Sequence, residues 1–167
     1  TPTRRQRQMC IRDSEKVIVD DLFIDIFKKS KIIYEKTNGY FDPSIGLLLD
    51  YAGFGPTKNQ NIVLEDSLAI ILKTVGFDKI DIVDGHVRKL NNKSKLDFNA
   101  IAKGYAVDVI SEFLNSKSIE DYMVDIGGEI RTSGKNHLKD MFWSIAIENP
   151  IPNKSDDKFY KKIALQN

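Results

Sequence analysis

A tight-turn signal, Asp84-Gly85, constrains the fold of this chain more than any other feature. Residues 79–90 alternate in polarity on both sides of it, which is the pattern of two strands joined by a two-residue hairpin. Amphipathic helical patterns over 20–38 and 65–75 precede the hairpin, with no regular strand–helix alternation. This mixture argues against a doubly wound sheet. The sequence predicts an α+β fold, with a mixed antiparallel sheet and packed helices.

Turn residues and periodicity predict the remaining elements. Gly39 ends the first helix, and a short helix follows Pro43 over 44–50. A strand ends at 95–98, and Asn99 is a good N-cap for a helix that runs to about Asn115. Its expected core face consists of Ala102, Tyr105, Ala106, Val109, Ile110 and Phe113. Further strands are expected over 122–126, 143–148 and 159–165, and residues 129–133 either continue the first of these strands or begin the next one.

The first 14 residues differ from the rest of the chain. They carry four arginines and one aspartate and have no apolar periodicity, whereas the body strongly prefers lysine. One reading is a basic arm for nucleic acid or membrane; the other is a non-native or disordered leader. The change in cation usage favours the leader, so the folded domain is assigned to residues 15–167. The whole-chain net charge of +1 predicts no nucleic-acid partner.

Cysteine usage and chain ends set further bounds. Cys10 is the only cysteine, which excludes a disulfide within the chain and a cysteine-based zinc site. No run of 18 apolar residues is present. Residues 159–165 look like a strand with nothing after it to turn or cap the chain. We therefore expect a fold that is incomplete at both ends.

The segment from Leu96 to Gly104 carries the strongest chemical signal. It joins a strand end to a helix start, where free backbone N–H groups suit a phosphate. Lys103 opposes the helix dipole there, and Gly104 costs the helix about 1 kcal/mol relative to alanine. Both residues make sense if a ligand or another backbone approaches closely, and Asp97 is placed to bind a ligand or help a metal site. Alternatively, Lys103 faces solvent, Gly104 permits tight packing and Asp97 caps its own turn.

Two further motifs have a ligand reading and a structural one. Gly127-Gly128 follows an apolar strand and marks either a close approach to a ligand or a plain bulge. Tyr40-Phe41-Asp42-Pro43 offers aromatics that stack on a planar ring and a carboxylate for polar edges, or is a turn with core aromatics. His86 and His137 show no metal spacing and no partner acid in sequence, so both are interpreted as solvated. No phosphate-binding P-loop, dinucleotide fingerprint or nucleophile elbow is present.

Together these motifs, in this order and spacing, resemble one family from about residue 14 to the end: the ApbE-like FAD:protein FMN transferases. The matching segments are Thr37–Gly46, Gly53-Phe54-Gly55, Leu96–Asp108, Val124–Ile130 and Trp143–Pro150. The resemblance implies a fold related to the T-fold. It also implies transfer of FMN from FAD to a threonine hydroxyl of a target protein, with release of AMP. Mg²⁺ assists cleavage of the FAD pyrophosphate in this family. The alternatives are an FAD pyrophosphatase that yields FMN and AMP, and a non-catalytic flavin-binding module.

The resemblance also assigns residues. The FAD contacts it implies are Tyr40, Phe41, Asp42, Asp97 and Lys103. Ala100 matches a magnesium-ligand position, where alanine offers only its backbone carbonyl. Gly127-Gly128 is expected to let the chain pass close to the flavin nucleotide. No catalytic residue is identified.

Some features of the family are missing from this sequence. Its later motifs, with the Asp and Thr side chains that complete the magnesium site, and its extreme N-terminal region are absent, and Ala52 stands where relatives often have Trp. We therefore expect an internal fragment that does not turn over alone. The implied partner is a flavoprotein with an acceptor threonine, such as a subunit of a membrane redox pump. The implied location is the periplasm or the outer face of the membrane, through a lipid anchor that is not in this chain.

Overall fold

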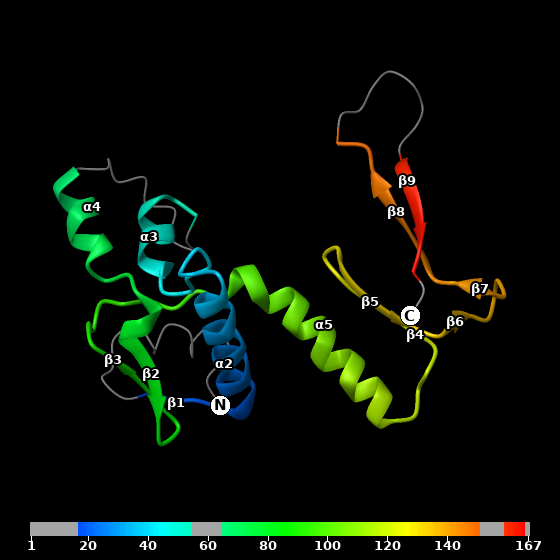
Figure 1. Cartoon of the computed structure of the whole chain (residues 1–167), viewed down its shortest axis with the longest axis horizontal. Helices are drawn as coiled ribbons and strands as arrows, with labels where there is room; N and C mark the ends of the chain where they lie inside the picture. Colours follow the sequence, from blue (N-terminus) through cyan, green and yellow to red (C-terminus); the bar gives the residue numbers. More distant parts are fainter. Residues whose placement is uncertain (1–16, 55–64, 151–158, 166–167) are drawn as a thin grey trace. The chain divides into compact units, whose positions relative to one another are not determined.

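The computed structural model describes residues 17–54, 65–150 and 159–165. The leader predicted at 1–14, which contains Cys10, the end of the Gly53-Phe54-Gly55 motif, and residues 152–158 lie outside these residues. The chain divides into two compact units, residues 1–101 and residues 102–167 (Figure 1).

The first unit combines three helices with a small sheet. Its elements are β1 (Val17–Ile18), α2 (Asp21–Lys36), α3 (Gly46–Tyr51), α4 (Glu65–Leu72), the 3-10 turn η1 (Phe77–Lys79), β2 (Ile80–Val83) and β3 (His86–Lys89). The three strands pair antiparallel in the order β1-β3-β2. Val83 pairs with His86 across Asp84 and Gly85, whose φ angles are +52° and +71°. Two positive φ values define the tight hairpin turn that the sequence predicts.

Helix α2 begins and ends at clear signals. The Asp20 carboxylate accepts a hydrogen bond from the Phe23 N–H at 2.9 Å, which caps the helix start. At the other end, Asn38 and Gly39 have positive φ angles, and the Gly39 N–H donates to the Tyr34 carbonyl at 2.9 Å. This left-handed ending satisfies the last helical carbonyls. The predicted helix and its stop at Gly39 are confirmed.

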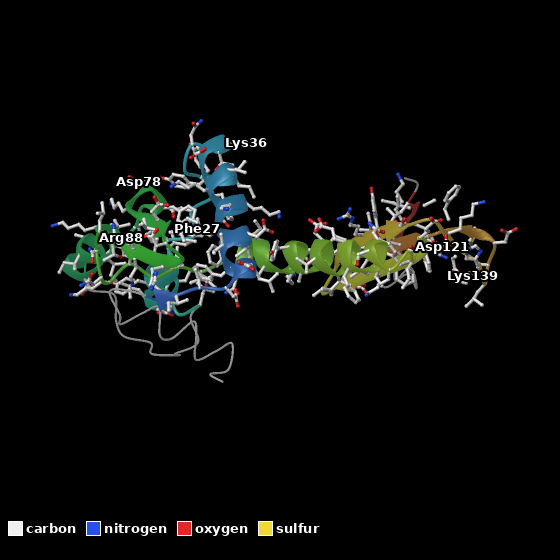
Figure 2. All side chains as sticks on the ribbon, turned by 90° about the horizontal axis from the view of Figure 1, so that it is seen from below. Phe27, Lys36, Asp78, Arg88, Asp121 and Lys139 are labelled. Carbon is white, nitrogen blue, oxygen red and sulfur yellow. The ribbon has the colours of Figure 1, made fainter. Side chains whose placement is uncertain are left out.

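The core of the first unit brings together residues that are far apart in sequence. Phe27 of α2 (labelled in Figure 2) packs with Phe77, Ile80 and Val87, and all four are at most 2% exposed. The rings of Phe27 and Phe77 meet edge-on with centroids 4.7 Å apart. Aromatic pairs of this geometry stabilise a core beyond the area they bury.

The second unit is built on α5 (Asn99–Ser116), whose first residues belong to the first unit. Its strands are β4 (Tyr122–Ile126), β5 (Glu129–Ser133), β6 (Lys135–Asn136), β7 (Met141–Phe142), β8 (Ser144–Glu148) and β9 (Phe159–Ala164). They form three antiparallel pairs: β4-β5, β6-β7 and β8-β9. Val107 of α5 packs with Tyr122 and Val124 of β4, joined by the half-buried Leu114 and Ile126. The α+β class is confirmed.

The predicted core face of α5 is wrong. Val107 and Ser111 are the buried residues, whereas Ile110 and Phe113 of the predicted face are 42% and 59% exposed. Apolar residues occupy several sides of this helix, so periodicity alone did not select the side that meets the hairpin.

The predicted strand at 95–98 is also wrong. Lys95 forms only an isolated parallel bridge with Ile45, and residues 96–98 have no regular structure. The Asp97 N–H donates to the Pro43 carbonyl rather than to a strand. In the described parts of the chain, no helix is long and apolar enough to cross a membrane.

Candidate functional site

The turn after α2 carries Tyr40, Phe41 and Asp42. The Thr37 hydroxyl accepts a hydrogen bond from the Phe41 N–H at 3.1 Å, and the Asp42 carboxylate accepts one from the Ser44 N–H at 2.7 Å. Tyr40 is 96% exposed, so its ring is not a core aromatic. Phe41 and Asp42 are half-buried. The turn therefore presents one fully accessible aromatic ring beside a carboxylate with a defined position.

The segment of Asp97 lies directly against this turn. The Asp97 N–H donates to the Pro43 carbonyl at 2.7 Å, and the Gly46 N–H donates to the Lys95 carbonyl at 3.0 Å. A Cβ atom on Gly46 would lie 2.7 Å from that same carbonyl oxygen, so only glycine fits. The structure thus brings together two predicted site segments that are more than fifty residues apart.

An ion pair and a buried hydroxyl hold this crossing, the contact between the turn after α2 and the segment from Lys95 to Asp97, in place. The Lys95 ammonium lies 2.6 Å from the Asp50 carboxylate of α3, and both side chains are about one-fifth exposed. On the other side of the turn, the buried Ser44 hydroxyl accepts a hydrogen bond from the Gly76 N–H at 2.7 Å. Buried polar groups that are paired in this way hold a loop in one arrangement.

The Asp97 carboxylate caps its own turn, as one of the two readings predicts. One oxygen accepts from the Asn99 N–H at 2.8 Å and the other from the Asn99 side-chain amide at 3.0 Å. Helix α5 begins at Asn99, so the Asp97 side chain, and not that of Asn99, accepts the hydrogen bond from the first N–H of the helix. Each carboxylate oxygen accepts more than one hydrogen bond, so this role does not preclude ligand contact.

Ala100 is exposed in the first turn of α5. No group of three or more His, Cys, Asp or Glu side chains that could hold a metal ion occurs in the described ranges. The described residues therefore contain no full set of carboxylate ligands for a magnesium ion.

In the second unit, Lys103 contacts the turn between β4 and β5. Its ammonium lies 2.8 Å from the Glu129 carboxylate and donates to the Gly127 carbonyl at 3.2 Å. The unfavourable position of this cation near a helix start is thus offset by an anion within the protein, not by solvent alone. Sequence reasoning missed Glu129. The signal was available, because a misplaced lysine needs an anion and Glu129 directly follows the glycine pair.

Gly127 and Gly128 form a hairpin turn, not the plain bulge considered from sequence. Ile126 pairs directly with Glu129, and the two glycines have φ angles of +60° and +94°. The Gly128 N–H donates to the Asp125 carboxylate at 3.0 Å. A Cβ on Gly127 would lie 3.5 Å from the Lys103 side chain. The turn therefore sets the backbone carbonyl and Glu129 in place for Lys103.

Gly104 does not serve tight packing between the described elements. A Cβ added to it would meet no described atom within 4 Å. The packing reading of this glycine is not supported, and the space beside it is open.

The two histidines differ in their surroundings. His86 contacts the Asp84 carbonyl within its own hairpin. His137 is exposed, as expected, but the expectation that no acid pairs with it is wrong, because its Nε2 contacts the Asp121 carboxylate. Asp121 (Figure 2) also accepts from the Lys135 N–H at 2.6 Å. The hydrogen bond from His137, then the one from Lys135, lowers the pKa of this carboxyl below its ordinary value.

An open cavity of about 490 Å³ lies elsewhere, between η1 and the β2–β3 hairpin of the first unit. Its lining includes Asp78 and Arg88, both labelled in Figure 2, and Lys79. None of the predicted site residues lines it. Its mixed charges give no preference for an anion, so it is not the candidate site.

Comparison with known proteins connects this geometry to a family. A family model described as the ApbE family matches residues 6–167. The chain is 34% identical over 138 residues to the FAD:protein FMN transferase of Vibrio cholerae, covering 82% of this chain and 41% of that protein. It is also 34% identical over 133 residues to the enzyme of the same name from Haemophilus influenzae, covering 77% and 38%. The chain thus spans about two-fifths of the length of these relatives.

Solved structures agree with the sequence match. The flavin transferase ApbE from Vibrio cholerae superposes with a TM-score of 0.75 at 32% identity, over 87% of this chain and 47% of that one. The ApbE protein of Thermotoga maritima gives a TM-score of 0.76 at 27% identity, over 96% and 51%. Because the family model matches nearly the whole sequence and the fold agrees, this chain belongs to the ApbE family.

Proposed function

We propose that the full-length protein containing this chain is an FAD:protein FMN transferase. It moves FMN from FAD onto a threonine hydroxyl of a target flavoprotein and releases AMP. Family membership and the names of the relatives support flavin transfer as the activity. The threonine acceptor and the release of AMP come from the family resemblance.

One structural observation carries the proposal furthest. Two segments that resemble the family's FAD-binding motifs, the Asp42 turn and the Asp97 segment, are joined by the hydrogen bond from the Asp97 N–H to the Pro43 carbonyl. Gly46 has no room for a side chain at the adjoining contact. A built crossing of this kind places an exposed ring, Tyr40, and two carboxylates on one scaffold, which suits the planar and polar parts of a flavin nucleotide.

The proposed roles follow from the chemistry of each side chain. Tyr40 stacks on a planar ring of FAD, and Asp42 and Asp97 accept hydrogen bonds from its sugar or ring N–H groups. Lys103 places positive charge near the pyrophosphate. Cleavage of that linkage develops negative charge on the leaving AMP, so a fixed cation lowers the barrier by stabilising the transition state.

We propose that Mg²⁺ takes part in the full-length protein, where it supplies Lewis-acid polarisation of phosphoryl oxygens. The described residues do not fit a complete magnesium site, since they contain no cluster of three ligating side chains. We assign to Ala100 one backbone carbonyl ligand. The remaining ligands are assigned to residues beyond those described.

The test uses the full-length protein with FAD, Mg²⁺ and a target peptide that carries the acceptor threonine. The expected result is fluorescent flavin covalently bound to the peptide together with an equal amount of AMP. A peptide with valine in place of threonine is the control and should remain unlabelled. Free FMN and AMP without labelled peptide would replace the transferase with an FAD pyrophosphatase. Binding of FAD without any cleavage would indicate a non-catalytic module.

We further propose that the protein acts in the periplasm or on the outer face of the membrane, as family resemblance implies. Fractionation of cells that express the full-length gene tests this. Recovery of the protein only in the cytosolic fraction would contradict it.

A further inference from the structure

The ion pair between Lys103 and Glu129 is unusual in its position rather than in its strength. The two side chains are 52% and 43% exposed, and an ion pair that exposed adds little to stability. Yet it joins the start of α5 to the turn between β4 and β5, where two consecutive glycines have positive φ angles. A weak ion pair at this glycine turn is better explained by a role in positioning the Lys103 ammonium than by a role in stability.

One N–H donor of the Lys103 ammonium has no acceptor among the described residues. An ammonium has three N–H donors. Gly127 and Glu129 accept from two of them, and no described residue accepts from the third. Both acceptors lie on one hairpin turn, so they restrict the ammonium from one side. The remaining N–H therefore has a preferred direction, away from the turn.

An open space adjoins this lysine on α5. Helical periodicity places position 104 on the same side of the helix as Val107 and Ser111, which are buried. A Cβ at Gly104 nevertheless meets no described atom within 4 Å. The glycine therefore lowers the stability of the helix at a position where no described element packs against it. That space leaves room for a ligand of some bulk next to Lys103.

The backbone of Glu129 has a fixed position. It is the first residue of β5 and pairs in register with Ile126 across the two-residue turn. Its carboxylate brings a charge that repels phosphate, so it is a poor neighbour for an anion site unless it acts through Lys103. Fixing the ammonium is the role that its position allows.

We propose that Glu129 is the positioning residue for Lys103. With the Gly127 carbonyl, it holds the ammonium so that its free N–H is directed at a phosphate oxygen of FAD. This inference rests on the proposed function, since it takes FAD as the ligand of that lysine.

The experiment measures KM for FAD and kcat in the full-length protein. Glu129→Ala should raise KM about tenfold and change kcat less than about twofold, as expected for loss of a charge-assisted hydrogen bond that orients a binding group. Glu129→Gln keeps an oxygen acceptor without the charge, so its KM should stay within about twofold of the wild type.

A double variant separates positioning from a direct contact. In a Lys103→Met background, adding Glu129→Ala should leave KM unchanged, because Glu129 acts only through the lysine. The matched control is Arg131→Gln, which breaks the 2.8 Å ion pair between Arg131 and Asp108. That pair joins the same helix to the same strand with similar exposure, so its loss should leave KM for FAD unchanged.

Three kinetic results would overturn the inference. They are an unchanged KM in Glu129→Ala, a Glu129→Ala effect that persists without Lys103, and an equal rise of KM in Arg131→Gln. If the wild type releases neither AMP nor FMN, the proposed function fails separately. FAD fluorescence titration then decides the inference: Glu129→Ala should still weaken binding. Equal affinity, or no binding of FAD by the wild type, overturns it.

Discussion

The two units support their candidate site residues in different ways. In the first unit, four nearly inaccessible side chains from α2, η1, β2 and β3 form a core with edge-on aromatic contacts. In the second, the core around Val107 is one helix face on one hairpin, and it contains three buried residues. The Asp42 and Asp97 segments are tied to each other by backbone hydrogen bonds. Lys103 depends on an exposed ion pair.

This difference shows which site residues are positioned by folding and which by local contacts. Backbone hydrogen bonds and an ion pair with little exposure hold the Asp97 segment, so a change of one surface side chain should not move it. The Lys103 side chain is long, has many rotamers and is held by two exposed acceptors. Its position should therefore respond to single substitutions on the hairpin, as the Glu129 experiment requires.

The largest expected effect is the loss of Phe77. Phe77→Ala removes a fully buried ring that contacts Phe27 and Tyr34, which should cost about 3–5 kcal/mol in the free energy of unfolding. Val124→Ala in the second unit removes two carbons and should cost about 2 kcal/mol. Native-state hydrogen exchange of amides in each unit measures both losses. An equal or larger loss for Val124→Ala would remove the contrast between the two cores.

A smaller effect is expected at Gly46. In Gly46→Ala the new Cβ meets the Lys95 carbonyl, a backbone group that cannot rotate away. The substitution should push α3 away from the Lys95 segment, which should lower the free energy of unfolding by about 1–3 kcal/mol and displace the Asp97 turn. Chemical denaturation measures the stability, and FAD titration measures the consequence for binding. Full retention of both would show that this crossing is not rigid.

Gly104→Ala is matched to Gly46→Ala, but it should raise the free energy of unfolding and not lower it. Because its Cβ meets no described atom, alanine should stabilise α5 by about 1 kcal/mol. FAD affinity should fall at the same time if a ligand uses the open space. Thermal unfolding and FAD titration of one protein sample test both. A gain in stability with unchanged affinity would mean that no ligand approaches this glycine.

The smallest expected effect concerns Asp121. Its hydrogen bonds from His137 and Lys135 lower its pKa in the folded protein below the ordinary value of 3.8. The unfolded chain then binds the proton more readily, so this carboxylate stabilises the fold above about pH 3.8, and the contribution is lost as pH falls through the lowered pKa. The protection of the Lys135 amide against exchange, measured relative to the intrinsic exchange rate at each pH, should fall in that window. Asp121→Asn should abolish this pH dependence of the protection, and an unchanged protection profile in the variant would contradict this assignment.

Local signals were sufficient for much of the fold. Asp84-Gly85 predicts its hairpin because two positive φ values favour these residues, and Gly39 predicts the end of α2 for a similar reason. The strand over 122–126 was predicted at its observed bounds, and residues 129–133, expected either to continue it or to begin the next strand, form the separate strand β5. The family resemblance was likewise available from ordered motifs alone, and the family model confirms it.

What the sequence by itself determined is most of the longer helices and strands, the α+β class and the family. The tertiary structure decided which side of α5 is buried, that Asp97 rather than Asn99 caps this helix, and that Glu129 holds Lys103. The physical reason is the range of the interactions. Turns and caps depend on neighbours a few residues away, whereas the burial of a helix with several apolar sides depends on a hairpin that forms only when the chain folds.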